Sequence, residues 1–327
     1  MTDKVRIGIL GTANIAEQIA KAAKLSNKVI INAIAGRNLD KSKQWADKFQ
    51  IPNFFGSYED LLKSDTIDAI YLPLPNSLHA EWTIKCLEAG YNVLCEKPIT
   101  TNTDDTEKVM EKSTATKLSV VEGFMYWHHP MYEEIKQIIG SGEIGSISSL
   151  NSCFSWYCDD RTETPASAEL GGGALFDVGC YPVHFSRNIL GMEPERVFAF
   201  EKRSNVDDTM VGALEFADGT LAQFETSIAN FERQQAEIVG TKGNIVIENP
   251  WVSAGKTTKL TINKEYAEPR TITFDVINTY QLELDHFADI VKSKKLCTTY
   301  MVDSIKNMKV IDALFTSAKT GAATAVK

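Results

Sequence analysis

The stretch from Val5 to Ala16 reads VRIGILGTANIA, a run rich in β-branched residues that leads into a glycine and then into small residues. Its first half has the apolar composition of a strand that is buried on both faces of a sheet. Residues 15–25 continue with apolar side chains at helical spacing. The stretch therefore predicts a strand that turns at Gly11 into the first helix of an α/β fold.

The same alternation of strand and helix continues through the first third of the chain. Apolar strand patterns cover residues 5–10, 29–35, 69–72, 93–95 and 118–121. Helical patterns cover residues 15–25, 41–49, 58–62, 78–89 and 103–115. This rhythm is typical of a doubly wound sheet of parallel strands.

After Gly123 the pattern changes to longer strands joined by hairpin signals such as Asp218-Gly219. A strand is predicted over residues 147–157, and helices over 131–139, 280–291 and 302–318. Runs of strands with peripheral helices indicate an α+β domain on a mainly antiparallel sheet. A chain of 327 residues has room for about two domains at roughly 150 residues each. We expect them to be residues 1–122 and 123–327.

Composition and charge exclude several classes of protein. With 43% hydrophobic and 24% charged residues, the chain is neither disordered nor fibrous. Its net charge of −9 repels phosphate backbones, so nucleic acid is not an expected partner. No apolar run approaches the roughly 20 residues of a membrane helix, and the start does not resemble a secretory signal. We expect a soluble cytoplasmic protein with no membrane partner.

The six cysteines are scattered, with no CxxC pair and no Cys/His cluster. This pattern predicts free thiols in a reducing compartment and no metal site.

The turn at Gly11 has the features of a dinucleotide site, although it reads G-x-A-x-x-A rather than G-x-G-x-x-G. Gly11 permits the tight turn, and small Ala13 and Ala16 let the backbone approach a pyrophosphate. The helix that follows offers its first N–H groups and its positive dipole end. Small residues also begin plain βα turns, which is the alternative. The predicted cofactor-binding residues of this turn are Gly11, Thr12, Ala13, Asn14 and Ile15.

The second strand ends in Ala35-Gly36-Arg37-Asn38, without the acidic residue that usually binds the ribose hydroxyls of NAD. Arg37 has the planar guanidinium that suits a 2′-phosphate, unless it is simply a solvated surface arginine. We therefore expect NADP(H) as the cofactor rather than NAD(H).

Two further segments follow strands at the carboxyl edge of the sheet, where open α/β folds bind their ligands. Residues 73–79 read PLPNSLH, and residues 96–98 read EKP. Lys97, before a proline, sits in an extended turn. A partly desolvated lysine facing the nicotinamide could exchange a proton with a hydroxyl or carbonyl, although an ordinary strand-end lysine is the alternative. We expect these segments to bind the cofactor through Leu74, Asn76, His79, Glu96 and Lys97.

Three motifs in this order resemble the glucose–fructose oxidoreductase / inositol dehydrogenase / rhizopine-catabolism (Gfo/Idh/MocA) family. They are the PNxxH turn at 75–79, the AGxxVLxEKP run at 89–98 and the GGGxLxDxGxY segment at 171–181. The resemblance is greatest to the dihydrodiol dehydrogenase and D-xylose 1-dehydrogenase branch. It implies a Rossmann domain and an α+β domain whose open sheet forms a homodimer or homotetramer. It also implies hydride transfer between NAD(P) and a carbinol or carbonyl carbon of a sugar or diol.

The resemblance assigns roles to individual residues. Lys97 matches the catalytic lysine of the family, and Asp177 and Tyr181 match positions that flank the substrate carbon. Either Lys97 or Tyr181 would be the proton donor and acceptor, while the other binds the substrate oxygen and Asp177 orients Lys97 or a substrate hydroxyl. His184 stands where inositol dehydrogenases carry Asp, which argues against an inositol substrate.

Asp177, Tyr181 and His184 are spaced to share one face of a helix. Pro182 either begins that helix or kinks one that starts earlier. Without the resemblance, a packed core pair would be the preferred interpretation of Tyr181 and His184.

An aromatic segment, YWHHP at 126–130, follows the sixth strand. By the resemblance, Trp127 covers the cofactor ring and His128 binds its carboxamide or a sugar hydroxyl. Adjacent histidines point in different directions, so a metal site here is not expected. Trp156 is either an aromatic wall for a sugar or part of the core.

The predicted function is an NADP(H)-dependent oxidoreductase of the aldose 1-dehydrogenase or trans-dihydrodiol dehydrogenase type. The alternatives are a keto-sugar reductase of the same family and a non-catalytic regulator that senses a dinucleotide. The predicted substrate-binding residues are Lys97, His128, Trp156, Asp177, Tyr181 and His184.

Overall fold

A computed structural model describes residues 4–252, 255 and 257–327, which group into two compact units. The first unit comprises residues 4–125 and 278–305, and the second comprises 126–277 and 306–327, within those described residues. The expected domain boundary between residues 122 and 123 lies close to residue 125, where the chain first leaves the first unit. The expectation did not foresee that residues 278–305 belong to the first unit.

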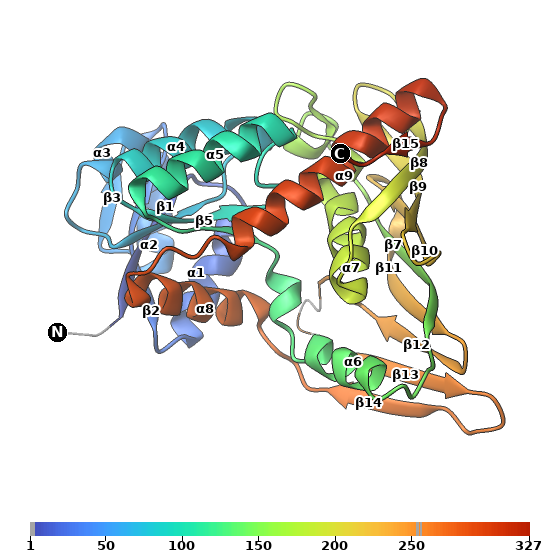
Figure 1. Cartoon of the computed structure of the whole chain (residues 1–327). Helices are drawn as coiled ribbons and strands as arrows, with labels where there is room; N and C mark the ends of the chain where they lie inside the picture. Colours follow the sequence, from blue (N-terminus) through green and yellow to red (C-terminus); the bar gives the residue numbers. More distant parts are fainter. Residues whose placement is uncertain (1–3, 253–254, 256) are drawn as a thin grey trace. The chain divides into compact units, whose positions relative to one another are not determined.

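The first unit is built on a six-stranded parallel sheet with the order β3-β2-β1-β4-β5-β6 (Figure 1). Its strands are β1 (Val5–Leu10), β2 (Val29–Ala35), β3 (Asn53–Phe55), β4 (Ala69–Leu72), β5 (Asn92–Glu96) and β6 (Val120–Gly123). Between them lie α1 (Ile15–Leu25), α2 (Leu39–Phe49), α3 (Tyr58–Leu62), η1 (Asn76–Leu78), α4 (His79–Glu88) and α5 (Thr103–Thr116). The strand order is that of a doubly wound dinucleotide-binding sheet.

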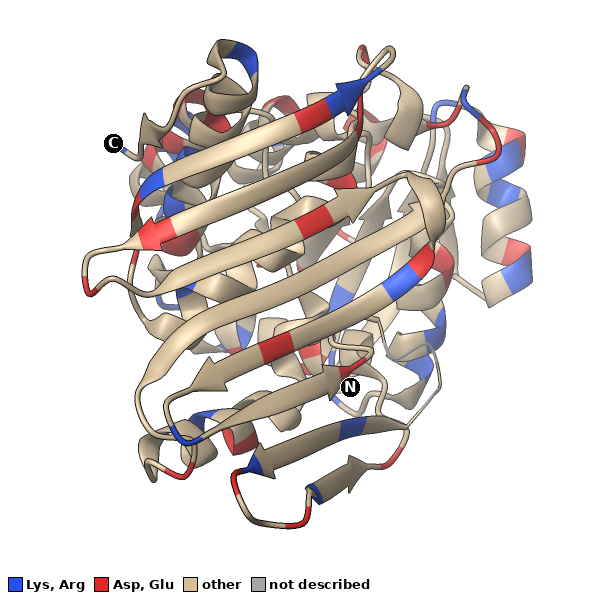
Figure 2. Cartoon of the chain, turned by 90° about the vertical axis from the view of Figure 1, so that its right-hand side faces the viewer, with Lys and Arg blue, Asp and Glu red and all other residues tan. Residues whose placement is uncertain are grey.

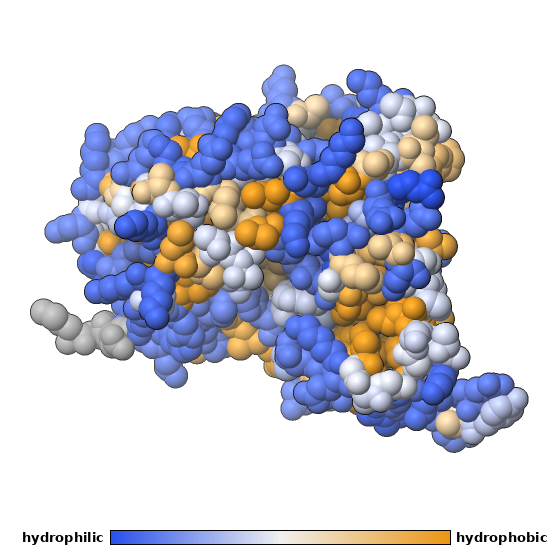
Figure 3. Space-filling view, in the orientation of Figure 1, coloured by the Kyte–Doolittle hydropathy of each residue, from blue (hydrophilic) through white to orange (hydrophobic). Residues whose placement is uncertain are grey.

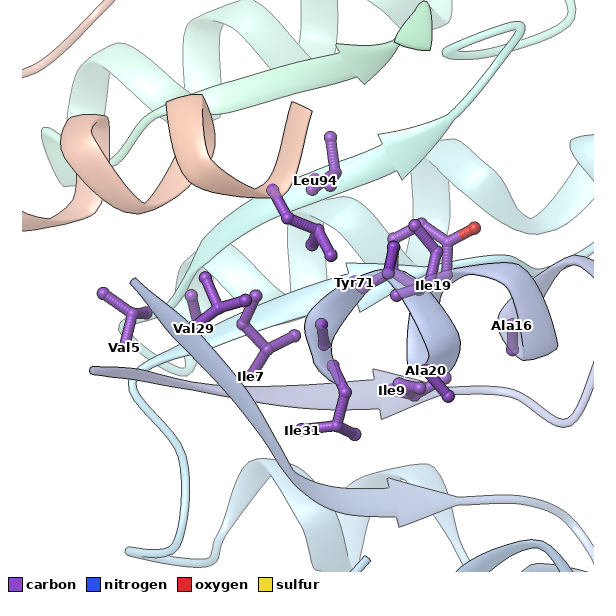
Figure 4. Close-up of a cluster of buried hydrophobic side chains, with 14 of the residues drawn as sticks. Val5, Ile7, Ile9, Ala16, Ile19, Ala20, Val29, Ile31, Tyr71 and Leu94 are labelled. Carbon is purple, nitrogen blue, oxygen red and sulfur yellow. The ribbon is translucent and has the colours of Figure 1, made fainter. Parts of the chain in front are cut away.

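Apolar side chains cover both faces of this sheet. On one face, Ile7 and Ile9 of β1 pack with Ile19 of α1 and with Phe287 of α8 (Thr279–Ser293). Figure 4 shows the β1, β2 and α1 side chains of this cluster together with Tyr71 and Leu94. The other face packs against α4 and α5 in a second cluster. Burial on both faces explains why these strands read as nearly uncharged runs, each large apolar side chain contributing roughly 1.5–3 kcal/mol.

The second unit is built on a nine-stranded sheet with the order β14-β13-β12-β11-β7-β10-β9-β8-β15. Neighbouring strands are antiparallel except for β7 and β10, which pair in parallel. In chain order, the strands are β7 (Ile147–Tyr157), β8 (Pro194–Arg203), β9 (Asp207–Phe216), β10 (Leu221–Ser227), β11 (Ala229–Gly240), β12 (Gly243–Glu248), β13 (Thr258–Lys264), β14 (Arg270–Phe274) and β15 (Thr324–Ala325). The predicted parallel sheet and mainly antiparallel sheet are therefore confirmed.

Helical segments accompany this sheet. They are η2 (Met125–His128), α6 (Met131–Gly140), η3 (Thr164–Ala166), the π-helical turn η4 (Leu175–Gly179), α7 (Cys180–Leu190) and, from residue 306 onward, α9 (Thr299–Thr320). Segment η4 and α7 pack against β7, β9 and β10, and Phe315 of α9 contacts Phe176 of η4. The central strands β7 and β10 contain few charged residues (Figure 2).

Hydrophilic side chains dominate the surface in Figure 3. Among the described residues, no helix is long and apolar enough to cross a membrane. None of the six cysteines forms a disulfide, and Cys86, Cys95, Cys158 and Cys180 are buried.

Candidate functional site

The β1–α1 turn places its backbone at the carboxyl edge of the parallel sheet. Gly11 has φ +141°, and a Cβ there would lie 3.1 Å from Cδ2 of Leu74. No side chain caps the start of α1, which is preceded by Thr12, Ala13 and Asn14. A tight glycine turn that leads into a helix with no side-chain cap fits the pyrophosphate of a dinucleotide.

The end of β2 lies beside this turn. A Cβ on Gly36 would come within 3.1 Å of Cγ2 of Thr12, so glycine allows the two loops to pack closely. Arg37 is exposed, and its charge opposes the rise in the pKa of Tyr58 that burial causes. Asn38 caps α2 by accepting a hydrogen bond from the N–H of Lys41. Arg37 therefore lies two residues after β2 with its side chain exposed.

His79 connects the loops after β4 and β5. It is fully buried, and its ring nitrogens lie 2.7 Å from the carbonyl oxygens of Leu74 and Pro98. Burial, with a smaller contribution from the charge of Lys97, lowers the pKa of His79 to about 4. The neutral ring has one N–H, so it donates to one carbonyl and contacts the other. His79 thus serves the predicted cofactor site by holding its two loops together.

The turn that carries Lys97 is stabilised by hydrogen bonds to Glu122, a residue that was not predicted from the sequence. Its carboxylate accepts hydrogen bonds from the N–H of Ile99 at 2.8 Å and from the hydroxyl of Ser304 at 2.6 Å. The Lys97–Pro98 peptide is cis. Glu96, at the end of β5, accepts a hydrogen bond of 2.6 Å from the hydroxyl of Tyr71. Asn76 lies in η1, on the neighbouring loop.

In the second unit, Asp177, Tyr181 and His184 lie along one continuous helical segment. Asp177 belongs to η4, and the other two belong to α7. Pro182 lies inside α7, so the helical path begins before the proline, as in one of the two predicted alternatives. A π-helical turn just ahead of a proline changes the usual hydrogen-bond register where the ring has no N–H to donate.

Hydrogen bonds fix this segment from neighbouring elements. The indole N–H of Trp156 donates to Oδ2 of Asp177 at 2.8 Å, and the hydroxyl of Tyr126 lies 2.6 Å from Nδ1 of His184. The Trp156 side chain is half-buried, and its indole N–H points toward Asp177. Both Tyr181 and His184 are buried, at 5% exposure each.

Aromatic rings surround Tyr181. Its ring centroid lies 5.5 Å from Tyr126, 5.4 Å from Phe154 and 6.2 Å from Trp251. Trp251, on the segment after β12, was not predicted, because no local pattern connects it to α7. Trp127 and His128 are half-buried in η2, and Trp127 lies 5.5 Å from His184.

Asp207 is a second residue that the sequence analysis missed. Its Oδ2 accepts a hydrogen bond of 2.7 Å from the N–H of Leu175, at the start of η4. A Cβ on Gly173 would lie 2.0 Å from Oδ1 of Asp207, so only glycine fits there. Burial raises the pKa of Asp207 to about 7. The carboxyl group thus anchors the GGG segment and the helical turn that carries Asp177.

The structure brings the predicted residues together in two groups, one in each unit. At the carboxyl edge of the first sheet, where β1, β2, β4 and β5 end and the next helical segments begin, lie Gly11, Thr12, Ala13, Asn14, Ile15, Arg37, Leu74, Asn76, His79, Glu96 and Lys97. Trp127, His128, Trp156, Asp177, Tyr181 and His184 lie on η2, β7, η4 and α7 of the second unit. Within the described part of the chain, no group of three or more His, Cys, Asp or Glu residues is arranged to hold a metal ion.

Two family models match the chain. Residues 5–124 match the model described as an oxidoreductase family with an NAD-binding Rossmann fold, GFO_IDH_MocA. Residues 132–246 match the GFO/IDH/MocA C-terminal domain.

Among similar proteins, D-xylose 1-dehydrogenase (NADP(+)) 2 of Haloferax volcanii is 35% identical over 97% of this chain and 98% of its own length. Trans-1,2-dihydrobenzene-1,2-diol dehydrogenase of Xenopus tropicalis is 33% identical over 70% of this chain and 74% of its own.

A crystal structure of a 3-ketoreductase from Actinomadura kijaniata, in complex with NADP and TDP-benzene, superposes with a TM-score of 0.91. It is 27% identical and covers 96% of this chain and 98% of its own. Further structures of that enzyme carry a lysine replaced by alanine or a tyrosine replaced by phenylalanine. The same number of residues separates those two positions as separates Lys97 from Tyr181.

Replacing Gly173 with alanine tests the anchor at Asp207. A side chain at φ +124° and 2.0 Å from a carboxyl oxygen should lower the free energy of unfolding by on the order of 2–3 kcal/mol. Urea unfolding would measure the loss. Gly219→Ala is the control, since it has φ +85° but no neighbour within 4 Å, and should lose about 1 kcal/mol. Equal losses would contradict the anchor.

Replacing Arg37 with alanine tests the preference for a 2′-phosphate. NADP(H) affinity should fall roughly 10- to 100-fold, because a charge-assisted hydrogen bond contributes about 1.5–3 kcal/mol. NAD(H) affinity should not change. Fluorescence titration with NADPH and NADH would measure both, with Lys48→Ala as the control because Lys48 pairs with Glu17. Equal weakening of both cofactors would show that Arg37 does not bind the phosphate.

Proposed function

We propose that this chain, which belongs to the GFO/IDH/MocA family of oxidoreductases, transfers a hydride between NADP(H) and a carbinol or carbonyl carbon of a sugar or diol. The observation that carries the proposal is the segment with Asp177, Tyr181 and His184, fixed by Trp156 and Tyr126. The polar groups are already oriented, with Tyr181 buried among aromatic rings. Such an arrangement suits a small polar molecule with an apolar ring face.

The proposed cofactor is NADP(H), held by Gly11, Thr12, Ala13, Asn14, Ile15 and Arg37 and by the loops of Leu74, Asn76, Glu96 and Lys97. When bound, it supplies or accepts the hydride. The name of the Haloferax relative and the NADP in the 3-ketoreductase structure support this choice over NAD(H). So does the absence of an acidic residue at the end of β2.

The chain's own residues handle the proton and the substrate. During oxidation of a carbinol, the hydroxyl proton passes to Lys97 or Tyr181, and the other of the two binds the substrate oxygen. Asp177 orients Lys97 or a neighbouring hydroxyl, and His128 and His184 bind further hydroxyl groups. Trp127 covers the nicotinamide. The lysine and tyrosine replaced in the 3-ketoreductase, with their matching separation, support this assignment.

The substrate class follows from the relatives. Two of them are named as dehydrogenases of a pentose and of a cyclic diol, which supports an aldose or a trans-diol as the substrate. The high structural similarity to a 3-ketoreductase supports the alternative, reduction of a keto-sugar.

A screen at 340 nm tests the proposed function. One set of assays combines NADP+ with aldoses and trans-diols and follows the rise in absorbance as NADPH forms. The other set combines NADPH with keto-sugars and follows the fall in absorbance. Turnover of at least one substrate is expected. Tight binding of NADP+ without turnover of any substrate would instead favour a dinucleotide-sensing regulator.

Replacing Lys97 with methionine should lower kcat by roughly 10²- to 10⁴-fold, the usual contribution of a general acid–base group. Affinity for NADPH should remain within a few-fold of that of the wild type. Lys108→Met, on the exposed face of α5, is the control and should keep full turnover. Near-normal turnover of Lys97→Met would remove Lys97 from the mechanism.

The cytoplasm is the proposed compartment, because none of the six cysteines forms a disulfide. The proposed assembly is a homodimer or homotetramer formed through the large sheet. Phe200 of β8 is 67% exposed and pairs with Val211 of β9, itself 49% exposed. Tyr157 and Leu221 are also exposed on neighbouring strands. An apolar area of this kind is typical of a protein interface.

Light scattering after size exclusion tests the interface. Phe200→Glu and Tyr157→Glu should shift the wild-type oligomer toward monomer, because each puts a charge into an apolar contact. Leu25→Glu changes an exposed residue of the other unit and should leave the oligomer intact. A wild-type monomer, or no change in either variant, would contradict the proposed interface.

A further inference from the structure

The peptide group between Pro98 and Ile99, directly after Lys97, is held by side chains at both of its polar atoms. The carbonyl oxygen of Pro98 lies 2.7 Å from Nδ1 of His79, which belongs to α4. The N–H of Ile99 donates to Oε1 of Glu122, on β6, at 2.8 Å. Because a peptide group is planar, partners at its two ends fix the orientation of the plane. The chain direction just after Lys97 is therefore set by α4 and β6.

The carboxyl group of Glu122 is itself fixed from two sides. Glu122 is 5% exposed and stands opposite Cys95 in the parallel pairing of β5 with β6. Its Oε2 accepts a hydrogen bond of 2.6 Å from the hydroxyl of Ser304, which is 1% exposed. Ser304 lies 182 residues further along the chain, in the part of α9 that belongs to the first unit. With a donor at each oxygen, the buried carboxyl group has little freedom to rotate away from Ile99.

Lys97 depends on this arrangement because little backbone freedom separates it from the held peptide group. The ring of Pro98 fixes its own φ at roughly −65°, so a fixed plane after Pro98 also restricts the path back to Lys97. A general acid–base group acts only within hydrogen-bond reach of the proton that it moves, and a displacement of about 1 Å can lower turnover on the order of 10²-fold. The hydrogen bond at Ile99 therefore bears on where the lysine is presented.

We propose that Glu122 and Ser304 are positioning residues for Lys97: they hold the N–H of Ile99 and so fix the direction in which the turn presents the lysine side chain. Both residues act through the backbone of the turn and not on the reacting atoms. The effect on turnover rests on the function proposed above, whereas the placement of Lys97 rests on the two hydrogen bonds of Glu122.

The variant Ser304→Ala removes the donor to Oε2 of Glu122 without adding bulk or charge. Ser317→Ala is the matched control, because Ser317 is a fully buried serine of the same helix whose hydroxyl donates to the carbonyl oxygen of Ala322 at 2.7 Å. The control should lower the Tm at least as much as Ser304→Ala does. Only Ser304→Ala should lower kcat, by roughly 10-fold, with KM and NADPH affinity within about twofold of those of the wild type.

Two substitutions test Glu122 itself. Glu122→Gln keeps an oxygen for the N–H of Ile99 and gains an N–H that can donate to the hydroxyl of Ser304, so kcat should stay within about threefold of the wild type. Glu122→Met has a similar length but no oxygen, so the N–H of Ile99 loses this partner and kcat should fall roughly 100-fold. Ser304→Ala, with its control, keeps the test available if Glu122→Met does not fold.

A further measurement reports on Lys97 without any substrate. NMR spectra of the protein with ¹³C-methyl groups on its lysines, recorded with and without NADP+, contain a Lys97 signal that Lys97→Met identifies by its loss. The position and width of this signal report the surroundings and the mobility of the side chain. The Lys97 signal should shift or broaden in Ser304→Ala and stay unchanged in Ser317→Ala.

Any of three results would overturn the proposal: the same kcat in Ser304→Ala and Ser317→Ala, the same kcat in the two Glu122 variants, or an unchanged Lys97 signal in Ser304→Ala. The NMR comparison does not depend on turnover. A substrate screen without activity would therefore reject the proposed function, and the Lys97 signal alone would then decide whether Glu122 and Ser304 position the lysine.

Discussion

The parallel pairing of the first sheet is the constraint on which the rest of the candidate site depends. Because β1, β2, β4 and β5 run in the same direction, all four end at one edge. The glycine turn, Arg37, the segment around His79 and Lys97 are thereby brought to one place from positions far apart in sequence. Their loops are then tied together, with His79 contacting two of them and Glu122 supporting the turn after β5.

In the second unit, the polar side chains are fixed by partners from other elements. Asp177 is held by Trp156, His184 by Tyr126, and the turn that carries Asp177 by Asp207. A site that is ordered before its ligand arrives loses less conformational entropy on binding.

Much of the fold follows from local patterns. The predicted bounds of β1, β2, β4, β7, α1 and α3 coincide with those observed, because apolar strand runs and helical periodicity are patterns of only a few neighbouring residues. The short strand β3 was missed, since three residues carry no clear pattern. The return of α8 to the first unit was missed as well, because an amphipathic helix does not reveal which sheet it will cover.

By itself, the sequence determined the alternation of elements, the glycine turn, the lack of an acid after the second strand and the motifs that indicate the family. Each of these features depends only on adjacent residues or on the number of residues between them, so it can be recognised in the sequence alone. Only the tertiary structure decided that Asp207 lies against Gly173 and that the indole N–H of Trp156 donates to Asp177. Each of these contacts joins separate elements, and its energy depends on burial and on partners that no local pattern encodes.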